Sequence, residues 1–570
     1  MQGSQAAGAP RWVAACLMAA AVVAACGGGG DGPPPSAAAT KTCAELVGLQ
    51  IPAASIGLPS GGGIVTATAT VPAAGTGTAA VGEYCRVDGA IKPVDPTAPD
   101  IQFRVALPTA WNGKGFMLGG GGSNGTLPNV AGNILNAPAN APSPLQRGYA
   151  VFGSDSGHQN SATVNAYAFQ LNDEAFRNYY GDALKKTRDA ALAVLQARYG
   201  KAADKSYFQG GSTGGREALT VAARWPADWD GVIVLFPAHE YTAARLYYIH
   251  LARALAAPGG YISREKRLAL RRAALAACDT LDGAADGVIS NVNRCNASFD
   301  PATALLDGAP LRCAGGADTG DNCLSDTQIR VLRLAQGSVA FDFAVPGGAG
   351  SYPGLNVYTS DTGVPGSGLQ ATVTNLSAFG AAAPSCPISP SVSLAAGSVD
   401  GYVRYAIARD ESFCMLNMDP INPAAYAQRW AALSVFEAPL SNMDGFAARN
   451  GKMLWAVGTE DMITGPRISE NSYLGWRARM GVDAVDKFAR FYLVPGFAHS
   501  LSTTFQMSWD QITALENWVE RGVDPKNNQV VADTIGVPGR TRPLCHYPGW
   551  PKYTGSGDVN SAASYVCAVD

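Results

Sequence analysis

Short apolar runs alternate with stretches of helical periodicity in the first half of the chain. Residues 100–107 alternate apolar and polar side chains, as in a half-buried strand. Further strand-like runs lie at 115–118, 149–152, 206–208 and 231–236. Helical spacing of apolar residues marks 172–198 and 215–224. Strands that alternate with helices predict a parallel sheet of the α/β class.

This alternation stops near residue 240 and resumes near residue 452. The intervening chain is Tyr-, Arg- and Ala-rich, then Cys- and Asp-containing, and then rich in Gly, Ser and Pro. Strand-like runs return at 453–457 and 488–494, followed by a helical pattern at 509–521. We therefore expect an α/β core in two parts, residues 41–239 and 438–570, with residues 240–437 forming an inserted lid domain.

The N-terminus has the pattern of an export signal. Arg11 precedes an apolar run, Val13–Ala25, that is too short to span a membrane as a helix. Residues 1–26 are therefore predicted to be a signal peptide. The run ends at Cys26 and resembles a bacterial lipoprotein signal, in which Cys26 would carry the lipid; ordinary cleavage at a small-residue site is the alternative. Residues 27–40 read as a flexible tether, so we expect a periplasmic, outer-membrane-anchored or secreted protein.

Export favours disulfides, and the cysteines other than Cys16 and Cys26 are even in number. Sequence does not fix their connectivity. Pairing each cysteine with its nearest neighbour gives, as a hypothesis, Cys43–Cys85, Cys278–Cys295, Cys313–Cys323, Cys386–Cys414 and Cys545–Cys567.

Composition and charge argue against several classes of partner. Only 15% of the 570 residues are charged and the formal net charge is −3. There is no basic stripe for nucleic acid, and no apolar run after the signal is long enough for a membrane helix. We expect a monomer that acts on a small molecule, with a lipid anchor as its only membrane contact.

Gly210-Gly211-Ser212-Thr213-Gly214 is a G-x-S-x-G motif between a predicted strand and a predicted helix. In that context the motif indicates a nucleophile elbow, a sharp turn that exposes the serine. A glycine-rich connection with an inert serine would fit the five residues equally well.

A serine nucleophile needs a base, and the base needs an orienting carboxylate. In the α/β-hydrolase order, both follow the serine along the chain. Strand 453–457 leads to Asp461 and strand 488–494 leads to His499. We therefore predict a triad of Ser212, Asp461 and His499, with Glu460 as the alternative acid.

The remaining histidines fit the role of base less well. His158 precedes the serine, and His239 and His250 lie at the entrance to the lid, where packing or substrate contact is expected. His546, beside Cys545, is expected at the surface. The oxyanion should be held by the amide of Thr213 and by an amide of the glycine run 119–122, for which we choose Gly122.

Several segments together resemble the tannase/feruloyl esterase family, including its mono(2-hydroxyethyl) terephthalate hydrolase branch. They are Phe116–Gly125, Ser154–His158, Asp204–Phe208, the elbow, Cys278–Gly287, Leu493–Gly496 with His499, and Thr541–Cys545. The resemblance implies an α/β-hydrolase core, a lid inserted after the strand that follows the elbow helix, and hydrolysis of aromatic carboxylic esters. It also implies a disulfide beneath the active site, but this chain has Gly211 and Ser500 where that family has the two cysteines.

An acidic loop follows Cys278. Asp279, Asp282 and Asp286 lie at i, i+3 and i+7, Gly283 and Gly287 follow the last two of them, and no Lys or Arg occurs from 279 to 293. Carboxylates in such a loop suit a hard cation, although an Asp/Gly-rich solvated turn would have the same composition. The resemblance implies structural calcium here, with the carbonyls of Ala284 and Val288 completing the ligand set.

The sequence therefore predicts an exported serine esterase that acts on feruloyl, galloyl or mono(2-hydroxyethyl) terephthalate esters through an acyl-enzyme. A calcium-dependent binding lipoprotein on a hydrolase fold, and an amidase or peptidase with the same triad, are the alternatives. An acid moiety with its own carboxylate would need a lid arginine, for which Arg404 and Arg409 are available.

Overall fold

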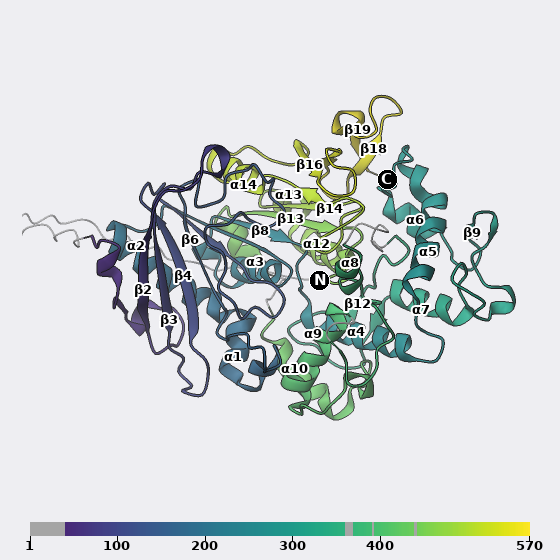
Figure 1. The fold of residues 1–570 in the computed structure, drawn as a ribbon, viewed down its shortest axis with the longest axis horizontal. Helices are drawn as coiled ribbons and strands as arrows, with labels where there is room; N and C mark the ends of the chain where they lie inside the picture. Colours follow the sequence, from purple (N-terminus) through teal and green to yellow (C-terminus); the bar gives the residue numbers. More distant parts are fainter. Residues whose placement is uncertain (1–39, 360–368, 390–392, 438–441, 570) are drawn as a thin grey trace, which may run out of the picture. The chain divides into compact units, whose positions relative to one another are not determined.

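A ten-stranded sheet is the centre of the fold in the computed structural model, which describes residues 40–359, 369–389, 393–437 and 442–569 (Figure 1). The predicted signal peptide, Cys26 and all of the tether except Thr40 lie outside these residues. The strand order is β1-β2-β3-β4-β6-β5-β7-β8-β13-β14. The strands are β1 (Gln50–Ile51), β2 (Gly63–Val71), β3 (Tyr84–Ile91), β4 (Ile101–Pro108), β5 (Lys114–Leu118), β6 (Ala150–Ser154), β7 (Lys205–Gly211), β8 (Gly231–Leu235), β13 (Lys452–Gly458) and β14 (Ala489–Val494).

From β6 to β14 the strands run parallel, whereas β1 to β4 and the β4–β6 pair are antiparallel. Both faces of the parallel part are covered, which is why its strands read as continuous apolar runs. On β13, Met453 and Trp455 face one buried cluster with helices α2, α3 and α12, while Leu454 and Ala456 face another with α14. These helices are α2 (Ala183–Tyr199), α3 (Thr213–Arg224), α12 (Pro466–Met480) and α14 (Gln511–Arg521).

The predicted α/β elements are present, with two differences. The helix expected over 172–198 is interrupted between α1 (Asp173–Arg177) and α2 by a π-turn, in which Gly181 has φ 142°. A Cβ there would lie 2.9 Å from the methyl carbon of Thr220 on α3, so the glycine allows close helix packing. Strands β2 and β3 were not predicted, because their exposed Ala, Thr and Arg positions give no clear apolar alternation.

Residues 240–437, called the lid segment below, form mainly helices with their own buried cluster. Trp430, Tyr402 and Leu332 belong to this cluster, which also includes Met462 and Ile468 from beyond β13. Its helices are α4 (Tyr241–Ala256), α5 (Arg264–Cys278), α6 (Val292–Ser298), α7 (Asp326–Gln336), α8 (Gln370–Asn375), α9 (Leu394–Tyr402) and α10 (Ala427–Ser434), and its short strands are β9 (Leu305–Leu306), β10 (Ala309–Pro310), β11 (Val339–Ala340) and β12 (Ser351–Tyr352). The boundaries at 240 and 437 remain predictions.

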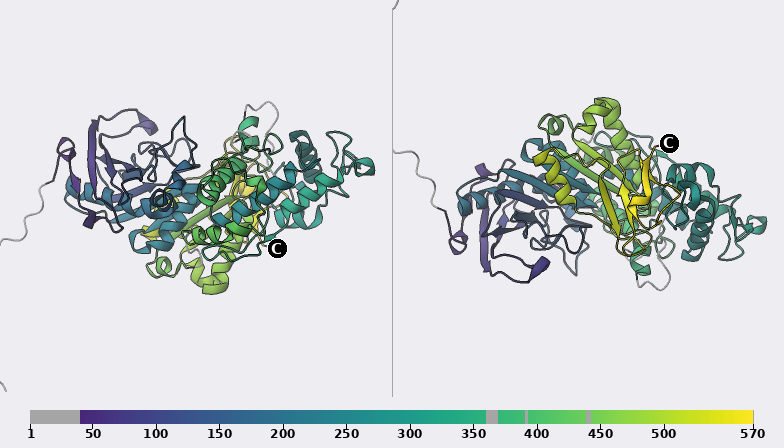
Figure 2. Two further views of the ribbon diagram at one scale, coloured as in Figure 1. Left: turned by 90° about the horizontal axis from the view of Figure 1, so that it is seen from below. Right: turned by 90° about the horizontal axis from the view of Figure 1, so that it is seen from above.

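The C-terminal strands β16 (Gln529–Asp533), β17 (Thr541–Leu544), β18 (Trp550–Tyr553) and β19 (Tyr565–Ala568) form two small sheets, the first together with β15 (Met507–Ser508). Of these strands, β18 contacts the short helix Asp279–Asp282 that follows α5, and β18 and β19 lie toward α6 (Figures 1 and 2). Two short helices, α11 (Asp444–Ala448) and α13 (Val482–Asp486), complete the elements after the lid segment.

Five disulfides are present, and each joins the two cysteines that nearest-neighbour pairing predicts. They join Cys43 to Cys85, Cys278 to Cys295, Cys313 to Cys323, Cys386 to Cys414 and Cys545 to Cys567. Within the described ranges, no helix has the length and apolar character needed to cross a membrane.

Candidate active site

Ser212 occupies the sharp turn between β7 and α3. Its backbone has φ 58° and ψ −121°, a conformation that L-residues rarely adopt and that marks stored strain. The turn needs small neighbours: a Cβ on Gly210 would lie 2.4 Å from the backbone of Gly214, and one on Gly214 would lie 2.6 Å from the carbonyl of Gly120. The G-x-S-x-G motif therefore adopts the geometry of a nucleophile elbow.

A hydrogen-bonded chain links the three predicted triad residues. The Nε2 atom of His499 lies 3.0 Å from Ser212 Oγ, and its Nδ1 atom lies 2.9 Å from Asp461 Oδ2. His499 and Asp461 are 3% and 1% exposed, so water does not compete for these bonds. Burial favours a neutral Asp461, but His499 and hydrogen bonds from Thr464 outweigh burial and lower its pKa. An ionised Asp461 can hold Nδ1–H and leave Nε2 free to accept the serine proton.

Glu460, the alternative acid, faces away from the hydrogen bonds that link Ser212, His499 and Asp461. Its carboxylate accepts hydrogen bonds from Arg271 of α5, with an Nη1–Oε2 distance of 3.0 Å, and from the hydroxyl of Thr504. The side chain of Asp461 has the acid's position, and Glu460 instead connects the strand end to the lid segment.

The other histidines take no part in this hydrogen-bonded triad. His158 stacks on Phe169 with ring centroids 3.7 Å apart. His239 lines the cavity that contains Ser212, and its Nε2 lies 3.0 Å from Ser469 Oγ. The expectation that His546 lies at the surface was wrong. It is 6% exposed, because it packs against Tyr473 of α12 and Tyr492 of β14.

The glycine run that follows β5 lies against the start of α3. Gly122 has φ 57°, and its carbonyl accepts a hydrogen bond from the Thr213 hydroxyl at 2.7 Å. As the first residue of α3, Thr213 has an amide without an intrahelical partner. Gly122, Thr213 and Ser212 line one cavity, as an oxyanion hole requires.

Glu217, which the sequence analysis did not single out, holds this loop. Its buried carboxylate, on α3, accepts hydrogen bonds from the Gly120 amide at 2.8 Å and from Asn124 Nδ2 at 2.7 Å. A glutamate inside an apolar helix one turn after a nucleophile motif is the only sequence signal that could have identified it.

An aromatic ring fills the space beside Gly211. A Cβ at Gly211 would lie 2.7 Å from the ring of Phe236 and 2.9 Å from a methyl of Leu135. The Phe236 ring also packs edge-on against His499, with centroids 5.0 Å apart. Phe236 thus provides direct packing between Gly211 of the elbow and His499.

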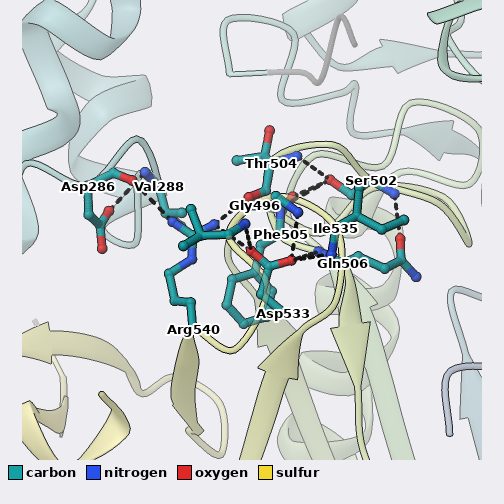
Figure 3. A network of polar contacts seen from close by, with 12 residues as sticks. Asp286, Val288, Gly496, Ser502, Thr504, Phe505, Gln506, Asp533, Ile535 and Arg540 are labelled. Atoms are coloured by element: carbon teal, nitrogen blue, oxygen red, sulfur yellow. Dashed lines mark hydrogen bonds and ion pairs between the residues drawn. The ribbon is translucent and has the colours of Figure 1, made fainter. Parts of the chain in front are cut away.

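The loop that carries His499, residues 495–506, is anchored by a buried ion pair (Figure 3). Asp533, at the end of β16, contacts the guanidinium of Arg540 at 2.8 Å and accepts an amide of this loop. Arg540 donates in turn to the carbonyl of Thr504 in the loop and to the carbonyl of Asp286. The histidine loop and the acidic loop therefore share one anchor.

The acidic loop binds its own backbone and a distant arginine. Asp279 accepts the Gly287 amide at 3.0 Å, and Asp282 accepts two amides of the same loop. Asp286 forms an ion pair with Arg542 of β17. The loop itself contains no Lys or Arg, so this partner comes from another part of the chain. The sequence gives no sign of this ion pair, since Arg542 lies on a C-terminal strand.

Only part of the acidic loop suits a cation. Burial raises the pKa of Asp282 to about 6, and the pKa of Asp279 is also raised, by burial and by the nearby charge of Asp286. A cation between the first two carboxylates would relieve this cost. However, across the described ranges no three His, Cys, Asp or Glu side chains are gathered as a metal site. The loop thus supplies two carboxylates, Asp279 and Asp282, that form no ion pair with a basic side chain of the described residues, whereas the charge of Asp286 is already neutralised by Arg542.

Ser212 opens onto two cavities. The first, with an empty volume of about 590 Å³ including open solvent, is lined by Gly122 and Thr213 and by Tyr241, Arg245 and Tyr248 of α4. The second, about 980 Å³ including open solvent, contains His499, Ser500 and Phe236. Gly122 and Leu394 of α9 line both cavities. An ester bound at Ser212 can therefore place its two halves in separate spaces.

Comparison with known proteins decides the family. The model of the family described as tannase and feruloyl esterase matches residues 85–568. This chain belongs to that family. An uncharacterized esterase of Agrobacterium fabrum is 37% identical, over 93% of this chain and 94% of that protein. The mono(2-hydroxyethyl) terephthalate hydrolase of Piscinibacter sakaiensis is 32% identical, over 86% and 85%.

A solved structure has the same fold. Feruloyl esterase B from Aspergillus oryzae aligns with a TM-score of 0.69 at 21% identity, covering 90% of this chain and 98% of that one. The protein therefore has an α/β-hydrolase core with a large inserted lid. Its family and its esterase relatives show that it is a carboxylic ester hydrolase.

Proposed function

We propose that the protein hydrolyses aromatic carboxylic esters through an acyl-enzyme on Ser212. His499 takes the Ser212 proton as Ser212 Oγ attacks the ester carbonyl, and the amides of Gly122 and Thr213 stabilise the oxyanion. His499 then protonates the leaving alkoxide, and water releases the acid by the reverse sequence. The observation that carries this proposal is the hydrogen-bonded chain from Ser212 through His499 to Asp461.

The two cavities suggest where each half of the ester binds. The leaving alkoxide must lie near Nε2 of His499 to receive its proton, so the alcohol belongs in the cavity that contains His499. The acyl half then occupies the other cavity, which is lined by Thr213, a residue that does not line the cavity of His499. Tyr167, Tyr241 and Tyr248 line that cavity, and their faces suit an aromatic acid.

The names of relatives support aromatic substrates. One relative is a mono(2-hydroxyethyl) terephthalate hydrolase and another, from Arthroderma benhamiae, is a probable feruloyl esterase. We therefore propose feruloyl, galloyl or mono(2-hydroxyethyl) terephthalate esters as the substrate classes.

A product assay over ethyl ferulate, methyl gallate and mono(2-hydroxyethyl) terephthalate tests the proposal. We expect at least one to be cleaved by the wild type and none by Ser212→Ala. The anilide of the best acid serves as the control for amidase activity and should be cleaved far more slowly. Equal cleavage by Ser212→Ala and wild type would refute the mechanism.

We also propose export, with the lipid on Cys26 as a further prediction. Five disulfides support an oxidising compartment. Labelling cells with a radioactive fatty acid should mark the wild type but not Cys26→Ser.

Calcium is proposed as a structural ion bound first by Asp279 and Asp282, with the carbonyls of Ala284 and Val288 as further ligands. Its charge would offset the cost of burying these carboxylates. Chelation should lower the melting temperature of the wild type but not that of Asp282→Asn, and metal analysis should find one calcium per chain. Equal melting temperatures with and without chelator, and no bound metal, would reject the ion.

A further inference from the structure

Arg271, on α5 of the lid segment, binds both loops that carry the acid and the base of the triad. Its guanidinium donates to the two carboxylate oxygens of Glu460, with N–O distances of 3.0 and 3.2 Å. It also donates to the hydroxyl of Thr504 at 2.7 Å. Glu460 directly precedes Asp461 in the loop after β13, and Thr504 follows His499 in the histidine loop. One side chain of the lid segment therefore joins the two loops.

Glu460 also connects these loops directly. Its backbone amide donates to the carbonyl of Phe497 at 2.9 Å, just before His499. Its carboxylate accepts the hydroxyl of Thr504 at 3.2 Å, beyond His499. The side chains of Glu460 and Arg271 are 3% and 14% exposed, so water screens their attraction only weakly. Because two parallel hydrogen bonds also fix direction, Arg271 determines where the Glu460 carboxylate lies.

Other arginines of the lid segment bind elsewhere. Arg404 and Arg409, the two that the sequence offered for substrate binding, donate to backbone carbonyls outside both loops. Arg267, one turn before Arg271 on α5, is also buried, but it donates to Ser377 Oγ at 3.0 Å within the lid segment. Of these four described side chains, Arg271 is the one bonded to the triad loops.

We propose that Arg271 is a positioning residue of the triad, through which the lid segment holds Asp461 against His499. This inference rests on the proposed function, because it takes these two residues as acid and base. Their Nδ1–Oδ2 distance of 2.9 Å depends on how the two loops lie against each other. Arg271 lines neither cavity at Ser212, so its effect on catalysis passes through the loops. The lid segment then completes the catalytic machinery as well as bordering the cavities.

Steady-state kinetics on the ester that the wild type cleaves best separate positioning from binding. Arg271→Gln should lower kcat by about ten- to a hundredfold, because small misplacements of catalytic groups have effects of this size. KM should change by no more than about threefold, since Arg271 does not touch the ester. Arg271→Lys should recover part of kcat, because an ammonium keeps the charge but lacks the planar fork that reaches both Glu460 and Thr504. A residue that only stabilises the fold would change the melting temperature and leave kcat of the folded enzyme unchanged.

A proton magnetic resonance spectrum reports the contact between Asp461 and His499 without any substrate. The His499 Nδ1 proton, held in a charge-assisted hydrogen bond, should give a low-field resonance that His499→Ala lacks. Arg271→Gln should shift or broaden this resonance. Arg267→Gln is the matched control, since it removes a buried guanidinium from the same helix, and it should lower stability while leaving the resonance and kcat unchanged.

The outcomes separate this proposal from the proposed function. Wild-type kcat or an unshifted resonance in folded Arg271→Gln would overturn the positioning role, even if ester cleavage depends on Ser212. A shifted resonance in a protein that cleaves no ester would instead refute the proposed function and leave the role of Arg271 in holding the two loops standing.

Thr504→Val covers the case in which Arg271→Gln does not fold. It removes only the hydroxyl that lies between Arg271 and Glu460. The loss of these hydrogen bonds should lower kcat at least about threefold and shift the low-field resonance. A folded Thr504→Val enzyme with wild-type kcat and resonance would refute the proposal.

Discussion

Glu217 is predicted to set the rate of catalysis without touching the substrate. Its carboxylate accepts the Gly120 amide at 2.8 Å and Asn124 Nδ2 at 2.7 Å, and so holds the glycine loop that contains the proposed oxyanion donor, Gly122. Hydrogen bonds to a charged acceptor contribute about 1.5–3 kcal/mol each. Glu217→Ala removes both bonds, so the part-buried Gly120 amide loses its acceptor and Asn124 Nδ2 keeps only its bond to Ser156 Oγ.

The expected effect falls on kcat. Removal of one oxyanion donor lowers kcat by about 100- to 1,000-fold. A loop that is loosened but still present should have an effect near the lower figure, so Glu217→Ala should lower kcat about 100-fold. KM should change by no more than about threefold, because the ground-state ester is held elsewhere. Glu217→Gln should be milder, since the unpartnered Oδ1 of Asn124 can turn to accept the new amide.

Steady-state kinetics on a nitrophenyl ester, at a temperature where circular dichroism shows folded protein, measure this effect. Glu174→Ala is the matched control: Glu174 is also buried and accepts loop amides, those of Val94 and Asp95, but lines neither cavity. It should lower stability and keep kcat. A Glu217→Ala enzyme with wild-type kcat, or equal losses in both variants, would refute the positioning role.

Three other predictions follow from buried contacts. Asp533→Ala leaves the guanidinium of Arg540 without its partner and should cost about 3–5 kcal/mol in urea unfolding; a loss below about 1 kcal/mol would contradict the ion pair's importance. Gly211→Ala should lower kcat by at least about tenfold through overpacking against Phe236, and Phe236→Leu should restore part of it; no loss would show that the ring moves freely. Burial lowers the pKa of His158 to about 4, so the unfolded chain binds its proton first as the pH falls. Relative to His158→Phe, the wild type should lose up to about 3 kcal/mol of unfolding free energy between pH 6.5 and 4, and parallel profiles would refute this.

Local signals made the α/β core and the positions of the triad predictable. The elbow motif is a five-residue turn, and β13 and β14 are apolar runs whose ends point to Asp461 and His499. Since parallel strands end at one edge of the sheet, chain order alone brings these residues near Ser212.

Contacts between distant segments were not predictable in this way. Arg245 reads as an ordinary helix residue until Tyr402, far along the chain, packs over it. Asp286 and Arg542 are likewise far apart in sequence. Such contacts arise from tertiary packing, which leaves no periodic trace in either segment.

Covalent trapping on Ser212 tests the central claim most directly. The enzyme is mixed with mono(2-hydroxyethyl) terephthalate or ethyl ferulate, quenched in acid during turnover, digested and analysed by peptide mass spectrometry. We predict an increase in mass equal to the acyl group on the peptide that contains Ser212. Turnover with Ser212 unmodified and the acyl group on another residue would contradict the account.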